Sequence, residues 1–311
     1  MLSKEKRKGH GFILVANVLF AVNMPISKYL LPSHVTPEAL TIMRMAFACV
    51  MFWITSLFMK QEKVPLKDLG LLFLCGMCGI AFNQSLFIIG LNRTSPVDAS
   101  IIATTGPIFV MLLAAVILKE PITRMKTFGV LMGVAGGTSL ILSSAQAGGG
   151  QSGSMDGDLL IVTSGFIYSI YVVLSKPLSV RYSSVTIMKW MFLFSTVVLL
   201  PFTYTFVLES PALYPGHSGW EVSGGLFYVL FGATFIPYLL IPMSLRRIRP
   251  TTVSMYNYIQ PIVASFIAVI VGQDRFTVGK CLSAAVVFLG VYLVTQSKSR
   301  EDVERERMKE K

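Results

Sequence analysis

The chain has 311 residues, of which 53% are hydrophobic and only 14% are charged, and its mean hydropathy is +0.66. Soluble globular proteins carry about 25% charged residues, so this composition excludes an ordinary soluble domain and indicates a membrane protein. The formal net charge of +11 is compatible with a nucleic-acid-binding protein or with basic membrane loops. The positions of the charges decide between these two classes.

Apolar runs long enough to cross a bilayer recur along the chain. A spanning helix needs roughly 20 mostly apolar residues, and ten runs come near this length. The alternating segments of an outer-membrane barrel are absent from the sequence. We therefore predict an all-α membrane protein with ten transmembrane helices. The expected spans are 11–31, 38–59, 68–91, 96–118, 125–143, 158–178, 185–207, 222–245, 251–272 and 277–296.

Lysine and arginine are concentrated in alternate connections between these spans. With the N-terminus in the cytoplasm, 21 of the 27 Lys and Arg residues fall in cytoplasmic segments. Cytoplasmic loops of membrane proteins carry such an excess, so we predict that both termini are cytoplasmic. The net charge then reflects topology in a lipid bilayer, and no nucleic-acid partner is expected. The first apolar run is longer than a signal-peptide core and precedes no small-residue cleavage site, so we expect it to be retained.

The chain contains an internal repeat. The segment LNRTSPVDASIIATTGPIF from residue 91 aligns without a gap with LRRIRPTTVSMYNYIQPIV from residue 245, and TIMR (41–44) aligns with TIMK (186–189). Each unit holds five predicted spans, and because five is odd the second unit enters the membrane from the opposite side. Inverted repeats are typical of secondary transporters, whose substrate site lies near the midplane. The expected organisation is a first repeat 1–143, a Gly/Ser linker 144–157, a second repeat 158–297 and a charged cytoplasmic tail 298–311.

Four stretches, FAVNMPISK (20–28), TIMRMAFA (41–48), SPVDASIIATTGPIFVMLLAAVILKEPIT (95–123) and PTTVSMYNYIQPIVASFIAVI (250–270), resemble the EamA type of the drug/metabolite transporter superfamily. The resemblance covers essentially the whole chain. It implies alternating access, a cavity lined by spans 1 to 4 and 6 to 9, a cytoplasmic (cell) membrane and a small-molecule substrate, most often an exported amino acid or other metabolite. No cofactor is implied, and the oligomeric state is left open.

Uncharged polar side chains within the predicted spans are candidates to line that cavity. The stretch YNYIQP (256–261) is the clearest case, because Pro261 frees a backbone carbonyl that must be satisfied within the protein or by water. Both a water-filled cavity and interhelical hydrogen bonding explain such residues. Pro107 and Pro261 are the expected hinge or helix-break positions. The cavity candidates are Asn17, Asn23, Asn83, Gln84, Thr104, Thr105, Tyr168, Tyr171, Tyr238, Tyr256, Asn257, Tyr258 and Gln260.

Four basic residues complete the candidate site. Arg44 and Lys189 are expected deep in the membrane, where charges are costly and usually functional. Lys28 and Lys176 are expected as vestibule charges, with snorkelling to the interface as the alternative. No acidic residue is expected deep in a span, which favours a carboxylate-bearing substrate such as an amino acid over a cationic drug. A multidrug exporter of the same fold and a non-transporting sensor or scaffold are the alternatives.

Neither an enzyme nor a metal site is expected. An intramembrane enzyme needs a nucleophile with a base, or metal ligands, but no His lies within a span and the acids lie in loops, tails or at helix ends. Cys75 and Cys78 form a C-x-x-C pattern, but they lie in an apolar helix without a second ligand pair. Packing of two small side chains explains that pattern better.

Overall fold

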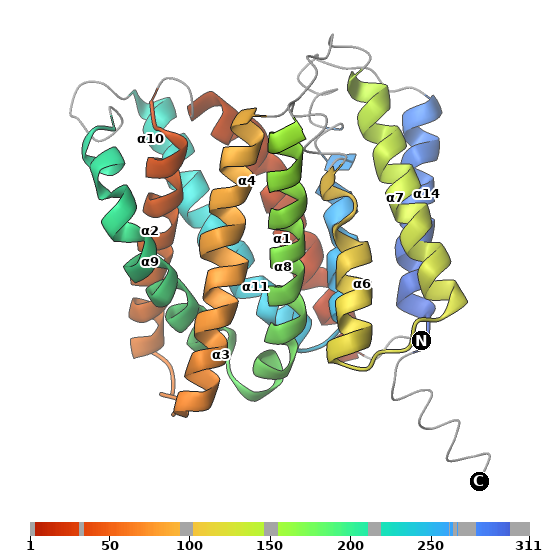
Figure 1. Ribbon diagram of the computed structural model, residues 1–311, viewed down its shortest axis with the longest axis horizontal. Coiled ribbons are helices and arrows are strands. Elements are labelled where there is room, and N and C mark those ends of the chain that lie inside the picture. The colour runs from red at the N-terminus through yellow and green to blue at the C-terminus, as the bar shows by residue number, and fades with distance from the viewer. Residues whose placement is uncertain are drawn as a thin grey trace.

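The computed structural model of the protein describes residues 4–30, 34–93, 102–145, 155–210, 219–260, 262–263, 266 and 278–298. All regular structure within these ranges is helical. Figure 1 shows the helices standing side by side as a bundle. The all-α prediction is therefore confirmed for this part of the chain.

Within the described residues, the first half of the bundle contains four single helices and one continuous helical run. They are α1 (Lys4–Leu30), α2 (Pro37–Leu57), the continuous run α3 (Leu66–Gly76), η1 (Met77–Ala81) and α4 (Phe82–Arg93), then α6 (Gly106–Ile117) and α7 (Arg124–Ala145). The second half contains α8 (Met155–Arg181), α9 (Ser184–Leu208), the run α10 (Trp220–Phe227), η3 (Tyr228–Phe235) and α11 (Ile236–Leu245), then α12 (Pro250–Met255), η4 (Tyr256–Tyr258) and α14 (Val278–Gln296).

Local sequence signals fix the starts of the two helices that carry Arg44 and Lys189. Thr36 caps α2, and its side chain accepts a hydrogen bond from the backbone N–H of Ala39 at 3.2 Å. Ser183 caps α9 in the same way, accepting from the N–H of Thr186 at 3.3 Å. Such caps satisfy backbone donors that have no partner inside the helix.

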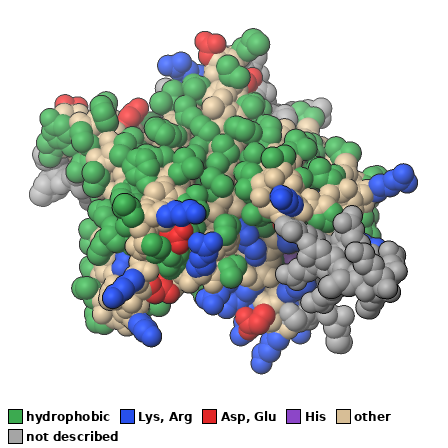
Figure 2. Space-filling view, turned by 60° about the horizontal axis from the view of Figure 1, so that its bottom comes forward, with side chains coloured by type: hydrophobic (Ala, Val, Ile, Leu, Met, Phe, Trp, Pro, Cys, Tyr) green, Lys and Arg blue, Asp and Glu red, His purple; other side chains and the backbone are tan. Residues whose placement is uncertain are grey.

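Five helical runs of the described chain are long and apolar enough to cross a membrane: Pro37–Leu57, Leu66–Gly90, Met155–Arg181, Ser184–Leu208 and Trp220–Leu245. The predicted total of ten spans stays a prediction, as does the sidedness of the termini. Figure 2 shows Lys and Arg side chains gathered most densely towards the lower end of the bundle, with hydrophobic side chains over much of the remaining surface.

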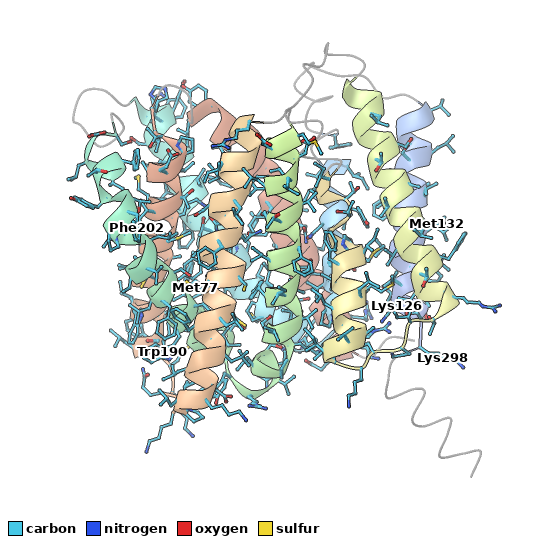
Figure 3. The ribbon with its side chains drawn as sticks, in the orientation of Figure 1. Met77, Lys126, Met132, Trp190, Phe202 and Lys298 are labelled. Atoms are coloured by element: carbon cyan, nitrogen blue, oxygen red, sulfur yellow. The ribbon has the colours of Figure 1, made fainter. Side chains whose placement is uncertain are left out.

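Two helical runs of the described chain contain a π-helical segment, η1 (Met77–Ala81) and η3 (Tyr228–Phe235). The offset that aligns Pro107 with Pro261 also aligns residues 77–81 with 231–235. Both units therefore build the wider turn at the same place. Met77, the first residue of η1, lies at mid-height of the bundle (Figure 3). π-helical turns are rare and are frequent at functional sites.

Residues at equivalent positions of the two units contact each other. At the same offset Gln84 corresponds to Tyr238, and Gln84 Nε2 donates to Tyr238 Oη at 2.8 Å. Thr104 corresponds to Tyr258, and Tyr258 Oη donates to the carbonyl of Thr104 at 2.6 Å. When two units are related by a two-fold axis, equivalent residues meet only along that axis. These pairs are therefore what a two-fold relation would produce.

The crossing of α7 and α14, which lie side by side at one end of the bundle (Figure 1), repeats this relation. A Cβ atom on Gly129 would lie 2.8 Å from the carbonyl oxygen of Gly290, and one on Gly136 would lie 2.9 Å from that of Ser283. Gly129 corresponds to Ser283 and Gly136 to Gly290 at the repeat offset, so each of these contacts is the equivalent of the other. Small residues let helix backbones approach closely, so the glycines of α7 serve packing.

Candidate functional site

Tyr238 is the centre of a buried cluster near the π-helical segments. It follows Pro237 at the start of α11, and only 5% of its surface is exposed. Its hydroxyl accepts the hydrogen bond from Gln84, and its ring meets the ring of Phe192 edge-on, with centroids 5.1 Å apart. Phe20 of α1 lies on another side, with a centroid distance of 6.2 Å. Four helical runs thus meet around one phenol.

Arg44 of α2 lies close enough to Tyr238 for the two to interact electrostatically. Its Nε donates to Thr234 Oγ1 of η3 at 2.7 Å. No other hydrogen bond and no ion pair of Arg44 occurs within the described part of the chain. The guanidinium group has five N–H donors, so its terminal nitrogens keep their hydrogen-bonding capacity.

Tyr168 and Tyr171 of α8 join this cluster, with ring centroids 5.6 Å apart. Tyr171 is fully buried against Gly79 of η1, where an added Cβ atom would lie 2.4 Å from the ring. Its hydroxyl, like Oε1 of Gln84, has no hydrogen-bond partner among the described residues. A buried polar atom without a partner costs about 1–3 kcal/mol. These two atoms are the polar groups of the cluster that the described residues leave unsatisfied.

The stretch from Tyr256 to Gln260 divides between packing and a free polar group. Gln260 Nε2 donates to Asn17 Oδ1 of α1 at 2.8 Å, and Tyr256 Oη lies 2.8 Å from Nδ1 of His10. Tyr258 is buried and reaches Thr104. Interhelical hydrogen bonding therefore explains these three side chains. Asn257 is half-buried, and its side chain makes no hydrogen bond to the described residues.

Asn83 and Asn23 belong to helix contacts. Asn83 Nδ2 donates to the carbonyl and the hydroxyl of Ser164 at 3.1 and 2.9 Å, which ties α4 to α8. Asn23 accepts from Ser27 of its own helix at 3.2 Å.

The residues around the start of α6 also have local partners. Thr105 donates to the carbonyl of Ile102 at 2.7 Å, and Thr104 lies 3.4 Å from Thr138. Pro107 is buried in the first turn of α6, a position that needs no backbone donor. Pro261, the other predicted hinge, lies outside the described residues.

The remaining basic candidates lie apart from the Tyr238 cluster. Lys189 Nζ donates to Gln61 Oε1 at 3.2 Å and lies 5.0 Å from the ring centroid of Trp53. Its neighbour Trp190 is near the lower end of α9 in Figure 3. Lys176 Nζ donates to the carbonyls of Leu245 and Ile248, beside the C-terminus of α11. The side chain of Lys28 lies outside the described residues.

Carboxylates join the two halves beside Lys189. Asp68 accepts hydrogen bonds from Arg181 at 3.1 Å and from Tyr182 at 2.6 Å, and the Asp68 contact raises the pKa of Tyr182. Glu62 accepts from the backbone N–H of Ser183 at 3.0 Å. Burial acts to raise the pKa of Glu62, but hydrogen bonds from Thr186 and Ser183 outweigh it and hold that pKa below its usual value.

Two other features carry no candidate chemistry. A cavity of about 140 Å³ between α2, α4 and α9 is mostly apolar, and none of the predicted site residues lines it. No group of three or more His, Cys, Asp or Glu side chains in the described chain could hold a metal ion. Cys75 and Cys78 are buried thiols.

Thr234 and Ser164 are polar partners of predicted site residues that the sequence reasoning missed. Thr234 is the sole hydroxyl-bearing residue in the apolar run from Leu226 to Pro237 apart from Tyr228. A lone threonine in such a run is the signal that would have found it. Ser164 has no comparable signal, because serines are common in its helix.

Comparisons with known proteins agree with this arrangement. The model of the EamA-like transporter family matches residues 7–142 and again residues 155–296. An uncharacterized transporter of Archaeoglobus fulgidus is 24% identical over 219 residues, covering 70% of this chain and 73% of that protein. The protein WALLS ARE THIN 1 of Arabidopsis thaliana is 25% identical, covering 94% and 80% respectively. A solved structure titled "Crystal structure of protein" superposes with a TM-score of 0.75 at 18% identity, covering 95% and 97%.

Proposed function

The chain belongs to the EamA-like transporter family, and we propose that it is a secondary transporter that exports a small carboxylate-bearing solute, such as an amino acid, across the cell membrane. The family membership identifies a membrane transporter of small molecules rather than an enzyme. The solute, the direction and the alternating-access mechanism are our proposal. The observation that carries it is the environment of Arg44.

Arg44 offers an anion-binding group that has no anionic partner among the described residues. Its one hydrogen bond within the described chain goes to a neutral hydroxyl. An intramembrane charge is expensive unless it is paired or faces water, so an anion brought by the solute would lower its cost. The terminal nitrogens of a guanidinium group match a carboxylate in a bidentate arrangement. A carboxylate is therefore the solute group that this position favours.

The rest of the Tyr238 cluster suits the remainder of an amino acid. Gln84 Oε1 is a buried acceptor without a partner among the described residues, and an ammonium group is a suitable donor for it. Tyr168 and Phe20, which are only partly buried, offer aromatic surface to an apolar side chain. No hydrogen bond of Tyr238 or Gln84 within the described chain involves an acid that would prefer a cationic solute.

The relation between the two units supports alternating access. The same family model matches both halves, and equivalent residues meet at the Gln84–Tyr238 and Thr104–Tyr258 contacts. An inverted pair of units gives two states of the protein when they exchange conformations around a site at the midplane. The Tyr238 cluster, beside the π-helical segments of both units, is our candidate for that site.

Uptake of radiolabelled solutes into proteoliposomes tests the proposal. The panel contains amino acids, other carboxylates, their primary amides and lipophilic cations, each measured with wild type, Arg44→Gln and Lys189→Gln. We expect saturable transport of at least one carboxylate solute, strongly reduced in Arg44→Gln. Transport of lipophilic cations without carboxylates would replace this proposal with a multidrug exporter. No transport of any solute by folded protein would favour a sensor or scaffold.

A further inference from the structure

We propose that Thr234 is a positioning residue for the solute: it fixes the Arg44 guanidinium so that both terminal nitrogens are offered to the carboxylate. This inference rests on the proposed function, and it assigns a role to a residue that touches the arginine rather than the solute. Thr234 is fully buried in η3. It belongs to the second unit, whereas Arg44 belongs to the first.

The hydroxyl of Thr234 has two partners, Val229 and Arg44, and they determine where it donates and where it accepts. Its single proton is donated to the carbonyl oxygen of Val229 at 2.7 Å. A lone pair is then left to accept the N–H of Arg44 Nε, also at 2.7 Å. The guanidinium group is planar, so fixing the Nε–H direction fixes the plane and the direction of the terminal fork. An arginine held only by its aliphatic stem would have to lose that freedom when a solute binds.

The π-helical turn explains why this threonine reaches Arg44. Several threonine hydroxyls in α-helical parts of the chain donate to the carbonyl four residues before, as Thr163 does to Leu159 at 2.8 Å. Thr234 donates instead to the carbonyl five residues before it. The wider turn of η3 therefore sets the side chain at a different angle and leaves its oxygen accessible to α2, which η3 contacts.

The other unit provides an internal comparison. The offset that aligns Pro107 with Pro261 places Ile80 of η1 at the position of Thr234, and the alignment of TIMR (41–44) with TIMK (186–189) places Lys189 at that of Arg44. The π-helical segment therefore forms with an apolar residue at this place, so the fold does not require the hydroxyl. Lys189 has no such hydroxyl and bonds to Gln61 instead. The hydroxyl occurs where the arginine is.

Three variants test the inference. Thr234→Val removes the acceptor at nearly constant volume, and Thr234→Ser restores it. Thr163→Val removes a hydroxyl of α8 that bonds to Leu159 and not to Arg44. A hydrogen bond to a charged group changes affinity by roughly 10-fold or more. We therefore expect Thr234→Val to raise KM for the carboxylate solute about 10-fold with kcat within about 2-fold. Preference for the carboxylate over its primary amide should fall by the same factor. Thr234→Ser and Thr163→Val should behave like wild type.

A double-mutant cycle separates positioning from general damage. In an Arg44→Gln background, Thr234→Val should add no further loss, because the group that it orients is absent. An equal loss of kcat for the carboxylate and the amide, or a Thr234→Ser variant as impaired as Thr234→Val, would overturn the inference. Unchanged KM in Thr234→Val would overturn it while leaving the proposed function in place. Absence of carboxylate transport by wild type would overturn both.

Discussion

Arg44 and Lys189 occupy equivalent places in the two units, and the protein uses them differently. Arg44 points its Nε at a buried hydroxyl of η3, beside the Tyr238 cluster. Lys189 reaches Gln61 in the connection between α2 and α3, with the rings of Trp53 and Trp190 flanking its amine. The flexible side chain of a lysine can place its charge at the membrane interface, whereas the guanidinium group of an arginine is planar and rigid. The two equivalent basic residues therefore have different neighbours, and we propose different roles for them.

The largest difference is expected when each charge is removed. Arg44→Gln should reduce carboxylate transport by about 100-fold, because several charge-assisted hydrogen bonds are lost together. Lys189→Gln should keep transport within about 3-fold of wild type, because its partners are protein groups away from the cluster. Initial rates in proteoliposomes, normalised to folded protein, measure both. Equal losses would show that the two positions still act as one site.

Exchanging the two basic residue types should give a smaller difference. Arg44→Lys keeps the charge but loses the Nε–H and the planar fork, so we expect KM to rise roughly 10-fold. Lys189→Arg should leave KM unchanged, since an arginine also interacts with indole rings. Concentration dependence of uptake checks both variants. A normal KM in Arg44→Lys would mean that point charge alone suffices at this position.

For stability, in contrast to transport, we expect replacement of Lys189 to have a larger effect than replacement of Arg44. Lys189→Met removes the amine that lies over Trp53 and bonds Gln61, and a cation–π contact contributes about 0.5–2 kcal/mol. We expect a lower melting temperature, by a few degrees, in detergent. Gln61→Ala should produce part of the same loss. A larger loss in Arg44→Met than in Lys189→Met would contradict the assignment of Lys189 to stability.

The smallest expected effect is a pH dependence beside Lys189. Because the folded state holds the pKa of Glu62 below its usual value, its ionised form adds stability that is present at neutral pH and lost as pH falls through that lowered pKa. Glu62→Gln should therefore melt slightly below wild type at pH 7, and the gap should close under acidic conditions. Ser183→Ala removes one of the donors to Glu62 and also the cap of α9, so it should lower the melting temperature at every pH, with a pH-dependent part in the same direction as that of Glu62→Gln. Melting curves across pH measure this, and a gap that widens in acid would reverse the sign.

The sequence predicted the helical class, the repeat and most of the polar residues that meet inside the bundle. Hydropathy and a constant offset carry that information directly. It could not predict the π-helical segments, because η1 and η3 lie in runs so apolar that a wider turn leaves no polar pattern to read. It also could not tell which side chains satisfy each other. Asn83 looks like a cavity residue until Ser164 is placed opposite it.

The contacts between equivalent residues have a consequence for how such a protein evolves and moves. If the units exchange shapes during transport, Thr104 meeting Tyr258 becomes Tyr258 meeting Thr104, so this contact can survive the exchange unchanged. The contact of Arg44 with Thr234 becomes that of Lys189 with Ile80, which cannot form the same bond. A contact between equivalent residues is therefore the same in both states and favours neither of them. A contact whose residues differ from their equivalents in the other unit gives the two states different free energies. A single substitution at such a position can therefore change which state the empty transporter prefers.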